Sequence, residues 1–383
     1  MRPVRTMRAA HIMRPVHTMS RAVTAVRQLL SSGPFRFAIV RYGFALLLGL
    51  VVTLLIVAAQ GVSPAQFASI IGQSTFGSPQ AMLNTIRWAT PVMLAALAYL
   101  VAARAGIFNL GVEGQAYFGG LVAAILATTL PLPGPLQLIV AALAGVLAGA
   151  LYALPAALLY RYWGVNEIVV TLMLNYIAVL VTTLIVRTWF LTYTNGVVSE
   201  TIATARIEAD ARIPALATGS SATWAILLVV ILCVITGLVL LRSWAGANLD
   251  TVGRSPGFAA FAGIDSARTQ FRAFLASGAL GGLVGAIEVL GSQGRFIKGF
   301  AGSFAFDGIL AAIIGGLNPF GVVASSLFYG ALTNTSFTLS SMTNVTSYLV
   351  MLIVAVFVIL FTIDPLRAIL ARRRAARSKG VDE

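Results

Sequence analysis

The sequence predicts an all-α polytopic membrane protein with about ten transmembrane helices. Of its 383 residues, 58% are hydrophobic and only 10% are charged, and the mean hydropathy is +0.91. A helical crossing of the bilayer needs about 20 apolar residues, so long uncharged stretches indicate membrane helices. Six such stretches contain no Asp, Glu, Lys or Arg: Tyr42–Ala59, Leu136–Tyr160, Ile168–Val186, Ala222–Leu241, Phe320–Leu339 and Val345–Ile363.

Four further apolar segments carry a charge, a proline or several glycines. A charge at the centre of a membrane helix costs roughly 2.5 to 3.5 kcal/mol on the insertion scale. Such helices therefore tend to face a bundle interior or a pathway rather than lipid. The four segments are Trp88–Ala103, Ile107–Leu130, Ala273–Gly291 and Phe304–Leu317.

Ten crossings would place both termini on the same side of the membrane, and the distribution of basic residues selects the cytoplasmic side. With the N-terminus inside, the inner segments hold 20 of the 26 Lys and Arg and the outer segments hold 6, as the positive-inside rule requires. Basic helix flanks beside an anionic leaflet also explain the net charge of +14 without a nucleic-acid partner.

The expected organisation is a basic, disordered cytoplasmic leader (1–36), a transmembrane domain (37–363) and a basic cytoplasmic tail (364–383). The outer loop 187–221 is polar and of mixed charge, which suits either a docking surface or a solvated loop. The cytoplasmic loop 242–272 is the second long connection.

Catalytic and metal chemistry find no support in the sequence. Cys233 is the only cysteine, and both histidines lie in the leader. The Gly-Lys pair of a phosphate-binding loop is missing, since the only lysines, Lys298 and Lys379, follow Ile297 and Ser378. We therefore expect a transport protein that is not an enzyme and holds no cofactor. Any ATP-driven role would place ATP and Mg²⁺ on a separate subunit.

A short helix is predicted within the cytoplasmic loop, just after Arg254. Ser255 suits an N-cap, Pro256 the first helical position and Gly263 the C-terminal stop. Two turns are marginal in water without a partner surface. The apolar stripe for that partner, or for the protein's own membrane surface, consists of Phe258, Phe261 and Ile264.

Candidate pathway residues begin beside Arg104. On a helix, Asn109 and Glu113 would share a face, with Gln115 just beyond them. Two interpretations stand. One is a broken helix at a substrate site. The other is a glycine-rich packing face on which Glu113 pairs with Arg104. Asn175, in an otherwise uncharged helix, is a further buried polar candidate that interhelical hydrogen bonding explains equally well.

The last two interrupted helices offer both packing and pathway features. Gly278, Gly281, Gly282 and Gly285 form two small-xxx-small spacings that favour tight helix contact. Glu288 and Asp307 near the outer helix ends, with Arg295 and Lys298 between them, suit ion pairs of a structural gate. Phe304 and Phe306 beside Asp307 would also suit stacking on a sugar or purine.

The run from Ala103 to Gln115 (ARAGIFNLGVEGQ) resembles the signature of bacterial ABC-importer permeases for nucleosides, within the branched-chain amino acid and simple-sugar permease family. The resemblance continues in Thr171–Tyr176, Gly253–Ile264, Phe306–Ile309 and Gly315–Pro319, and covers roughly 72–363.

It implies a type II-like importer fold that forms half of a channel, paired with a second homologous permease or with itself. The other implied partners are an ATPase with two fused nucleotide-binding domains, docked on Pro256–Gly263, and a substrate-binding lipoprotein or periplasmic binding protein. The expected location is the bacterial cytoplasmic membrane. Permeases for ribose- or galactose-type sugars remain an alternative, as does an autonomous ion-coupled transporter with a coupling-ion site among its membrane carboxylates.

Overall fold

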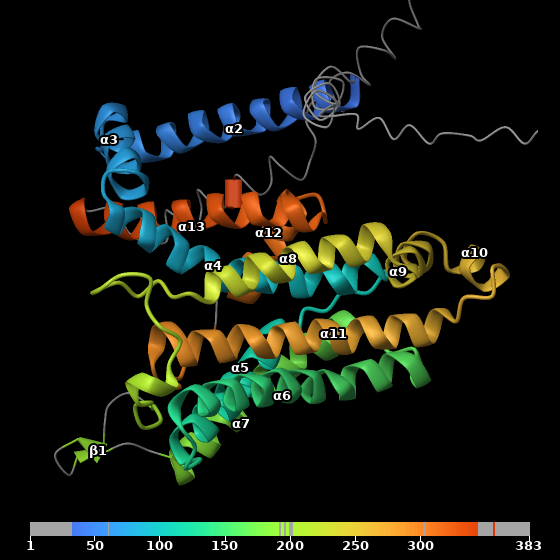
Figure 1. Cartoon of the computed structure of the whole chain (residues 1–383). Coiled ribbons are helices and arrows are strands. Elements are labelled where there is room, and N and C mark those ends of the chain that lie inside the picture. The colour runs from blue at the N-terminus through green and yellow to red at the C-terminus, as the bar shows by residue number, and fades with distance from the viewer. Residues whose placement is uncertain are drawn as a thin grey trace, which may run out of the picture. The chain divides into compact units, whose positions relative to one another are not determined.

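The computed structural model describes residues 33–59, 61–190, 193–194, 197–198, 202–301, 304–343 and 355–356. The chain divides into two compact units, residues 1–51 with 359–383 and residues 52–358, and the second holds nearly all the described structure (Figure 1). The basic leader before residue 33, the predicted helix Val345–Ile363, apart from two helical residues, and the tail lie outside the described residues, as does part of the outer loop.

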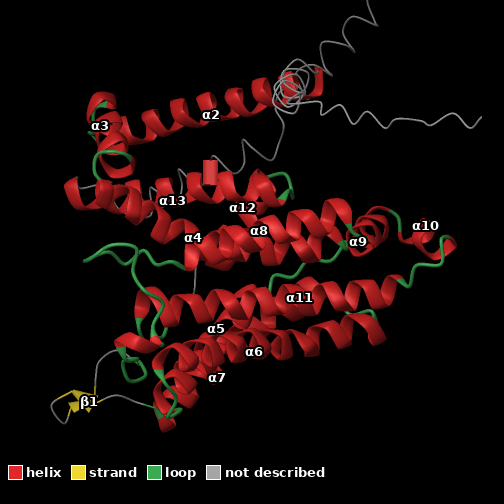
Figure 2. Ribbon diagram, viewed as in Figure 1, coloured by secondary structure: helices red, strands yellow, loops and turns green. Residues whose placement is uncertain are grey.

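Helices make up almost all of the described structure (Figure 2). Short connections join most of them, and two strands pair as an antiparallel ribbon of four residues. In chain order the elements are α2 (Gly33–Ala59), α3 (Pro64–Thr75), α4 (Pro79–Arg104), α5 (Val112–Thr129), α6 (Gly134–Trp163), α7 (Glu167–Trp189), β1 (Tyr193–Thr194), β2 (Val197–Val198), η1 (Ala209–Ala211), α8 (Ala225–Arg242), α9 (Trp244–Arg254), α10 (Pro256–Phe261), α11 (Ser266–Ile287), the π-helical turn η2 (Glu288–Gln293), α12 (Phe304–Ile314) and α13 (Pro319–Met342).

Five of the described helices are long and apolar enough to cross a membrane: α4, α6, α7, α8 and α11 with η2. A sixth span results if the bent pair Leu47–Ala59 and Pro64–Thr75 counts as one crossing. The chain is thus a multi-pass membrane protein. The number ten stays a prediction, because α12 has only 11 residues and the last predicted helix lies outside the described residues.

Two of the interrupted helices form the centre of the second unit. In the most apolar window of α4, 83% of residues are buried, and in that of α11 78%, against 22% to 28% for α6, α7 and α8. The outer helices instead expose apolar side chains, such as Leu143, Leu147 and Leu151 along one face of α6. The expectation that charge-bearing helices face the bundle interior is confirmed for these two, since lipid would not solvate their polar groups.

Glycines bring α6 and α11 into backbone contact. A Cβ atom on Gly282 would lie 2.3 Å from the carbonyl oxygen of Gly145 and 2.8 Å from the Cα of Gly149. On the other face of α11, a Cβ on Gly285 would lie 1.8 Å from the carbonyl oxygen of Ala116 on α5. The predicted packing role of the small-residue spacings on α11 is confirmed, because larger side chains cannot occupy these positions without separating the helices.

Helix α4 begins nine residues earlier than the apolar run from Trp88 indicated. The Ser78 side chain caps it by accepting a hydrogen bond from the Ala81 amide at 3.1 Å, and Pro79 occupies the first turn. Pro91 therefore lies in the middle of the helix rather than one turn from its start. Among the polar residues that led to the late start, Arg87 is buried against a partner on another segment, as described below.

Helix α9 was not expected within the cytoplasmic loop. Its N-cap is Ser243, whose side chain accepts a hydrogen bond from the Gly246 amide. Two glycines and an asparagine give this segment low helix propensity, which is why it was predicted as a loop. Tertiary contact overrides that preference, since a Cβ on Gly246 would collide with the carbonyl oxygen of Leu240 on α8.

Exposed tryptophans lie at both ends of the second unit. Trp163 and Trp244 lie at the end where α6 stops and α9 begins, which we call the α10 end, and Trp189 and Trp224 lie at the opposite end. Tryptophan is enriched at both membrane–water interfaces, where its ring is half in the headgroup layer. Exposed tryptophans at both ends of the helices fit a bilayer whose two faces lie at these ends.

Candidate functional site

The segment between α4 and α5 is not helical and is fixed by Asn109. This side chain is fully buried. Its amide nitrogen donates to Ser277 Oγ on α11 at 2.8 Å and to Gln115 Oε1 at 3.1 Å, and its oxygen accepts from Gln115 Nε2 at 3.1 Å and from the Gly111 amide at 2.9 Å. Ser277 Oγ in turn donates to the Ala98 carbonyl. Asn109 therefore precedes the helix and does not share a helical face with Glu113.

Asn175 performs a similar role from α7. Its side-chain nitrogen donates to the Leu110 carbonyl at 2.8 Å, and its oxygen accepts from the Gly114 amide at 2.9 Å. The start of α5 is thus held by side chains from α7 and α11. Glu113, in the first turn of α5, is half-buried beside Gly114. Asn109, Gln115 and Asn175 are committed to a buried hydrogen-bond network.

Arg104, at the last residue of α4, joins three segments. Its Nη1 donates to both carboxylate oxygens of Asp250 on α9, at 2.8 and 2.9 Å, and its Nε donates to the Leu317 carbonyl at 3.0 Å. Leu317 lies in the turn between α12 and α13 and has a positive φ of 51°. The partner of Arg104 is therefore Asp250, not Glu113, because the unexpected helix α9 brings Asp250 to the end of α4.

Helix α10 forms as predicted. The Ser255 hydroxyl accepts from the Phe258 amide at 3.3 Å, Pro256 is the first helical residue, and Gly263 follows the helix with a φ of 76°. Phe258 and Phe261 are 61% and 91% exposed, and Arg254 is exposed beside them. The two phenylalanine rings do not pack on the described part of the chain, whereas Ile264, the third residue of the stripe, is half-buried.

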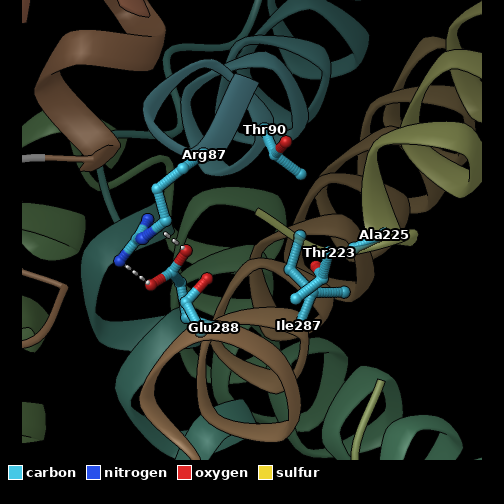
Figure 3. A pocket seen from close by; sticks show the side chains of 7 residues that line it. Arg87, Thr90, Thr223, Ala225, Ile287 and Glu288 are labelled. Carbon is cyan, nitrogen blue, oxygen red and sulfur yellow. Dashed lines mark hydrogen bonds and ion pairs between the residues drawn. The ribbon is translucent and has the colours of Figure 1, made fainter. Parts of the chain in front are cut away.

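Glu288 has a different partner from the one expected. Both of its oxygens accept hydrogen bonds from Arg87 on α4, at 3.1 and 3.0 Å, and the side chains are 2% and 9% exposed (Figure 3). Arg295 lies beyond η2 in a segment whose backbone pairs with residues 202–207. Glu288 is thus paired with Arg87 rather than with Arg295, and the ion pair joins α4 to the start of η2.

A small pocket adjoins this pair at the end opposite α10. The space between its lining atoms is about 200 Å³, a figure that includes open solvent. Sites for small organic ligands typically have a cavity of about 300 to 1,000 Å³, and this pocket encloses no such cavity. Its lining consists of Arg87, Thr90, Thr223, Ala225, Ile287, Glu288 and Ser292.

The aromatic residues of α12 divide between core and surface. Phe304 is buried against Trp88, with ring centroids 6.4 Å apart, whereas Phe306 is 45% exposed. Asp307 accepts a hydrogen bond from the Tyr329 hydroxyl on α13. The two predicted stacking residues therefore point to different environments, and only Phe306 presents its ring to the surface.

Sequence reasoning missed four residues of these arrangements. The sequence pattern places Arg87 and Asp250 in connections between helices. It indicates no role for Trp88 or Ser277, although both lie in predicted helices. Each pairs with a residue more than 140 positions away, as the 201-residue separation of Arg87 and Glu288 illustrates. The one local signal in the sequence is that an arginine directly precedes a tryptophan, which allows a cation–π contact. In the structure the Arg87 guanidinium lies 4.7 Å from the centroid of the Trp88 ring.

Most of the chain is similar to known transport proteins. A family model described as branched-chain amino acid transport system / permease component matches residues 81–359. The guanosine ABC transporter permease protein NupP of Bacillus subtilis (strain 168) is 30% identical over 321 residues, which cover 82% of this chain and 90% of NupP. The nucleoside ABC transporter permease protein NupB of Lactococcus lactis subsp. cremoris (strain MG1363) is 27% identical, covering 75% and 81%. The glucose ABC transporter permease protein TsgB13 of Haloferax volcanii is 31% identical, covering 72% and 74%.

Proposed function

The chain belongs to the branched-chain amino acid transport system permease family, and we propose that it is the membrane-spanning subunit of an ATP-driven importer of nucleosides. The observation that carries the substrate class is the similarity to NupP, named a guanosine permease, over 82% of this chain and 90% of that protein. NupB, named a nucleoside permease, agrees with it.

The energy for transport would come from a separate ATPase with two fused nucleotide-binding domains, which would hold ATP and Mg²⁺. Helix α10 is its docking element, since a two-turn helix with Phe258 and Phe261 exposed needs a partner surface to be stable. The α10 end therefore faces the cytoplasm. The basic residues of the leader and tail would favour the same side, beside the anionic inner leaflet of the bacterial cytoplasmic membrane.

Two further partners complete the importer. A substrate-binding lipoprotein or periplasmic binding protein would dock at the opposite end, where residues 202–224 pack on the segment after η2. A second, homologous permease would supply the other half of the channel. ATP binding and hydrolysis would then shift the open face of the channel between the two sides.

The pathway itself would form between the two permeases. The small pocket beside Arg87 and Glu288 does not supply this pathway, because it has no enclosed space for a nucleoside. Asn109, Gln115 and Asn175 would position α5, since their polar atoms are already paired. Phe306 and Glu113 are the remaining candidates for substrate contact, because one is exposed and the other only half-buried.

A second substrate class has an observation of its own. TsgB13, named a glucose permease, is 31% identical over 72% of this chain. Simple sugars share ribose-like hydroxyl groups with nucleosides, so a permease cavity that hydrogen-bonds these hydroxyls serves both. Uptake of labelled guanosine and of labelled glucose, measured separately with an excess of unlabelled uridine or ribose, distinguishes the two classes. Glucose uptake without guanosine uptake would assign the chain to sugars.

Copurification tests the docking role of α10. The double variant Phe258→Ala/Phe261→Ala should lose most of the ATPase that copurifies with the wild-type chain in mild detergent. Phe76→Ala is the matched control, because Phe76 is 74% exposed at the opposite end. Equal amounts of ATPase with the double variant and the control would exclude α10 as the docking element.

A further inference from the structure

The end of α4 lies between the two segments that flank α10. Before α10, α9 touches α4 through glycine, since a Cβ on Gly253 would lie 2.2 Å from the Arg104 carbonyl oxygen. After α10, the first turns of α11 contact the same place, where Gln270 Nε2 donates to the Ala105 carbonyl at 3.2 Å. A displacement of α10 therefore reaches the end of α4 from both sides.

The Arg104 side chain bonds the end of α4 to two other segments. Its guanidinium holds the Asp250 carboxylate on α9 with one nitrogen and the Leu317 carbonyl with another. Hydrogen bonds from a charged donor to a carboxylate are about twice as strong as neutral ones. The pair is partly buried, at 20% and 29% exposure, so solvent screens it less than a surface pair. Arg104 thus links α9 to α4 and to the α12–α13 turn.

Helix α4 connects this contact to the opposite end of the unit. Arg87 and Arg104 are 17 residues apart, or about 25 Å along a helix axis. Arg87 holds Glu288 at the start of η2, beside the small pocket. The intervening helix is packed on most sides by α11, α12 and α13. A closely packed helix of this kind transmits an axial or rocking movement rather than absorbing it.

We propose that Arg104 is a positioning residue for transport, which transmits the displacement of α10 through α4 to the Arg87–Glu288 pair. The proposal rests on the proposed function, since it requires an ATPase that moves α10. Arg104 itself touches neither ATP nor substrate. Without it, α10 still binds the ATPase, but hydrolysis no longer moves the opposite end of the bundle.

The first test measures substrate imported per ATP hydrolysed, in proteoliposomes that contain the complete importer. Arg104→Gln should lower this ratio by about five-fold or more, the lower end of typical coupling between sites, at unchanged ATPase copurification. Asp250→Asn should do the same, and the double variant should be no worse than either single variant, because paired residues are not additive.

Arg161→Gln is the matched control. It removes a positive charge near the C-terminus of α6, which lies at the α10 end like Arg104. Arg161 lies over the rings of Tyr162 and Phe271 and has no carboxylate partner among the described ion pairs. A normal ratio in Arg104→Gln, or additive losses in the double variant, would overturn the proposal. If wild-type liposomes import neither nucleoside nor sugar on addition of ATP, the proposed function fails, and this inference fails with it.

The second test follows the opposite end directly. Cys233 is the only cysteine, so Cys233→Ser gives a background in which Ser292→Cys places one thiol at the pocket. Labelling of that thiol by a maleimide should change on addition of ATP to the complete importer. In the Arg104→Gln background the change should disappear while ATP is still hydrolysed, whereas an unaltered ATP-dependent change would refute transmission through Arg104. Arg104→Lys, which keeps the charge, provides the variant for this test if Arg104→Gln does not assemble, and should retain part of the change.

Discussion

Removing Arg87 should destabilise the folded protein strongly, and the structure sets the magnitude. Arg87→Met leaves the Glu288 carboxylate, only 2% exposed, without the two hydrogen bonds at 3.1 and 3.0 Å that compensate its burial. Breaking a buried ion pair by removing one partner costs about 3 to 5 kcal/mol. Loss of the guanidinium from the face of Trp88 adds about 1 kcal/mol.

Thermal unfolding of the detergent-purified chain, followed by fluorescence-detected size exclusion, measures this effect. At about 2 °C per kcal/mol for a protein of this size, the apparent melting temperature should fall by roughly 8 °C or more. Replacing both partners, in Arg87→Met/Glu288→Met, should recover most of the loss, because apolar groups of similar volume replace a buried pair at little cost.

Arg187→Met is the control, since Arg187 is exposed at the same end of the bundle. Its melting temperature should match that of the wild type. The reasoning would be refuted if Arg87→Met had the same melting temperature as Arg187→Met, or if the double variant melted at a lower temperature than both single variants. Either result would mean that the Arg87 hydrogen bonds do not offset the cost of burying the Glu288 carboxylate.

Three further substitutions test the packing and the hydrogen-bond network. Gly282→Leu should abolish the monodisperse elution peak, because even a Cβ would lie 2.3 Å from the Gly145 carbonyl oxygen, whereas Gly72→Ala, which meets nothing within 4 Å, should elute normally. Asn334→Leu should cost about 1 to 3 kcal/mol in thermal unfolding, since it removes donors to two backbone carbonyls on other segments; an unchanged melting temperature would contradict this. Asn109→Ala should lower the yield of folded protein and leave the apparent KM for nucleoside uptake unchanged, because its polar atoms are already paired inside the protein. A raised KM at normal yield would instead place Asn109 in the pathway.

The helices that are apolar throughout could be predicted from hydropathy, since their boundaries follow from the cost of charge in lipid. The limits of α6 and α7 lie within three residues of the predicted ones. Helix α4 shows where this fails. Its first turns contain Gln80, Asn84 and Arg87, and only the fold reveals that the guanidinium meets a carboxylate on another helix.

Ion-pair partners were the least predictable feature. Glu113 and Glu288 were assigned partners close in sequence, but the arginines pair across the bundle with carboxylates 146 and 201 residues away. Local caps were predicted correctly, because Ser255, Pro256 and Gly263 act within one turn of the backbone that they satisfy.

The orientation depends on the chain ends rather than on the helical connections of the second unit. In that unit the α10 end and the opposite end carry equal numbers of basic residues. At the α10 end these are Arg104, Arg161, Arg242, Arg254, Arg268 and Arg272, and at the opposite end they are Arg87, Arg187, Arg206, Arg212, Arg295 and Lys298. The charge bias comes from the leader, the start of α2 and the tail. Labelling of single cysteines in the leader from the cytoplasmic side alone would confirm the assignment.

ATP-dependent uptake tests the central claim most directly. The chain, its permease partner and the ATPase are reconstituted in liposomes with the binding protein outside, and labelled guanosine is followed with ATP or a non-hydrolysable analogue within. We predict accumulation against a gradient that requires hydrolysable ATP and is lost in Phe258→Ala/Phe261→Ala but not in Phe76→Ala. Uptake that proceeds without the ATPase, or that follows an ion gradient alone, would contradict the account.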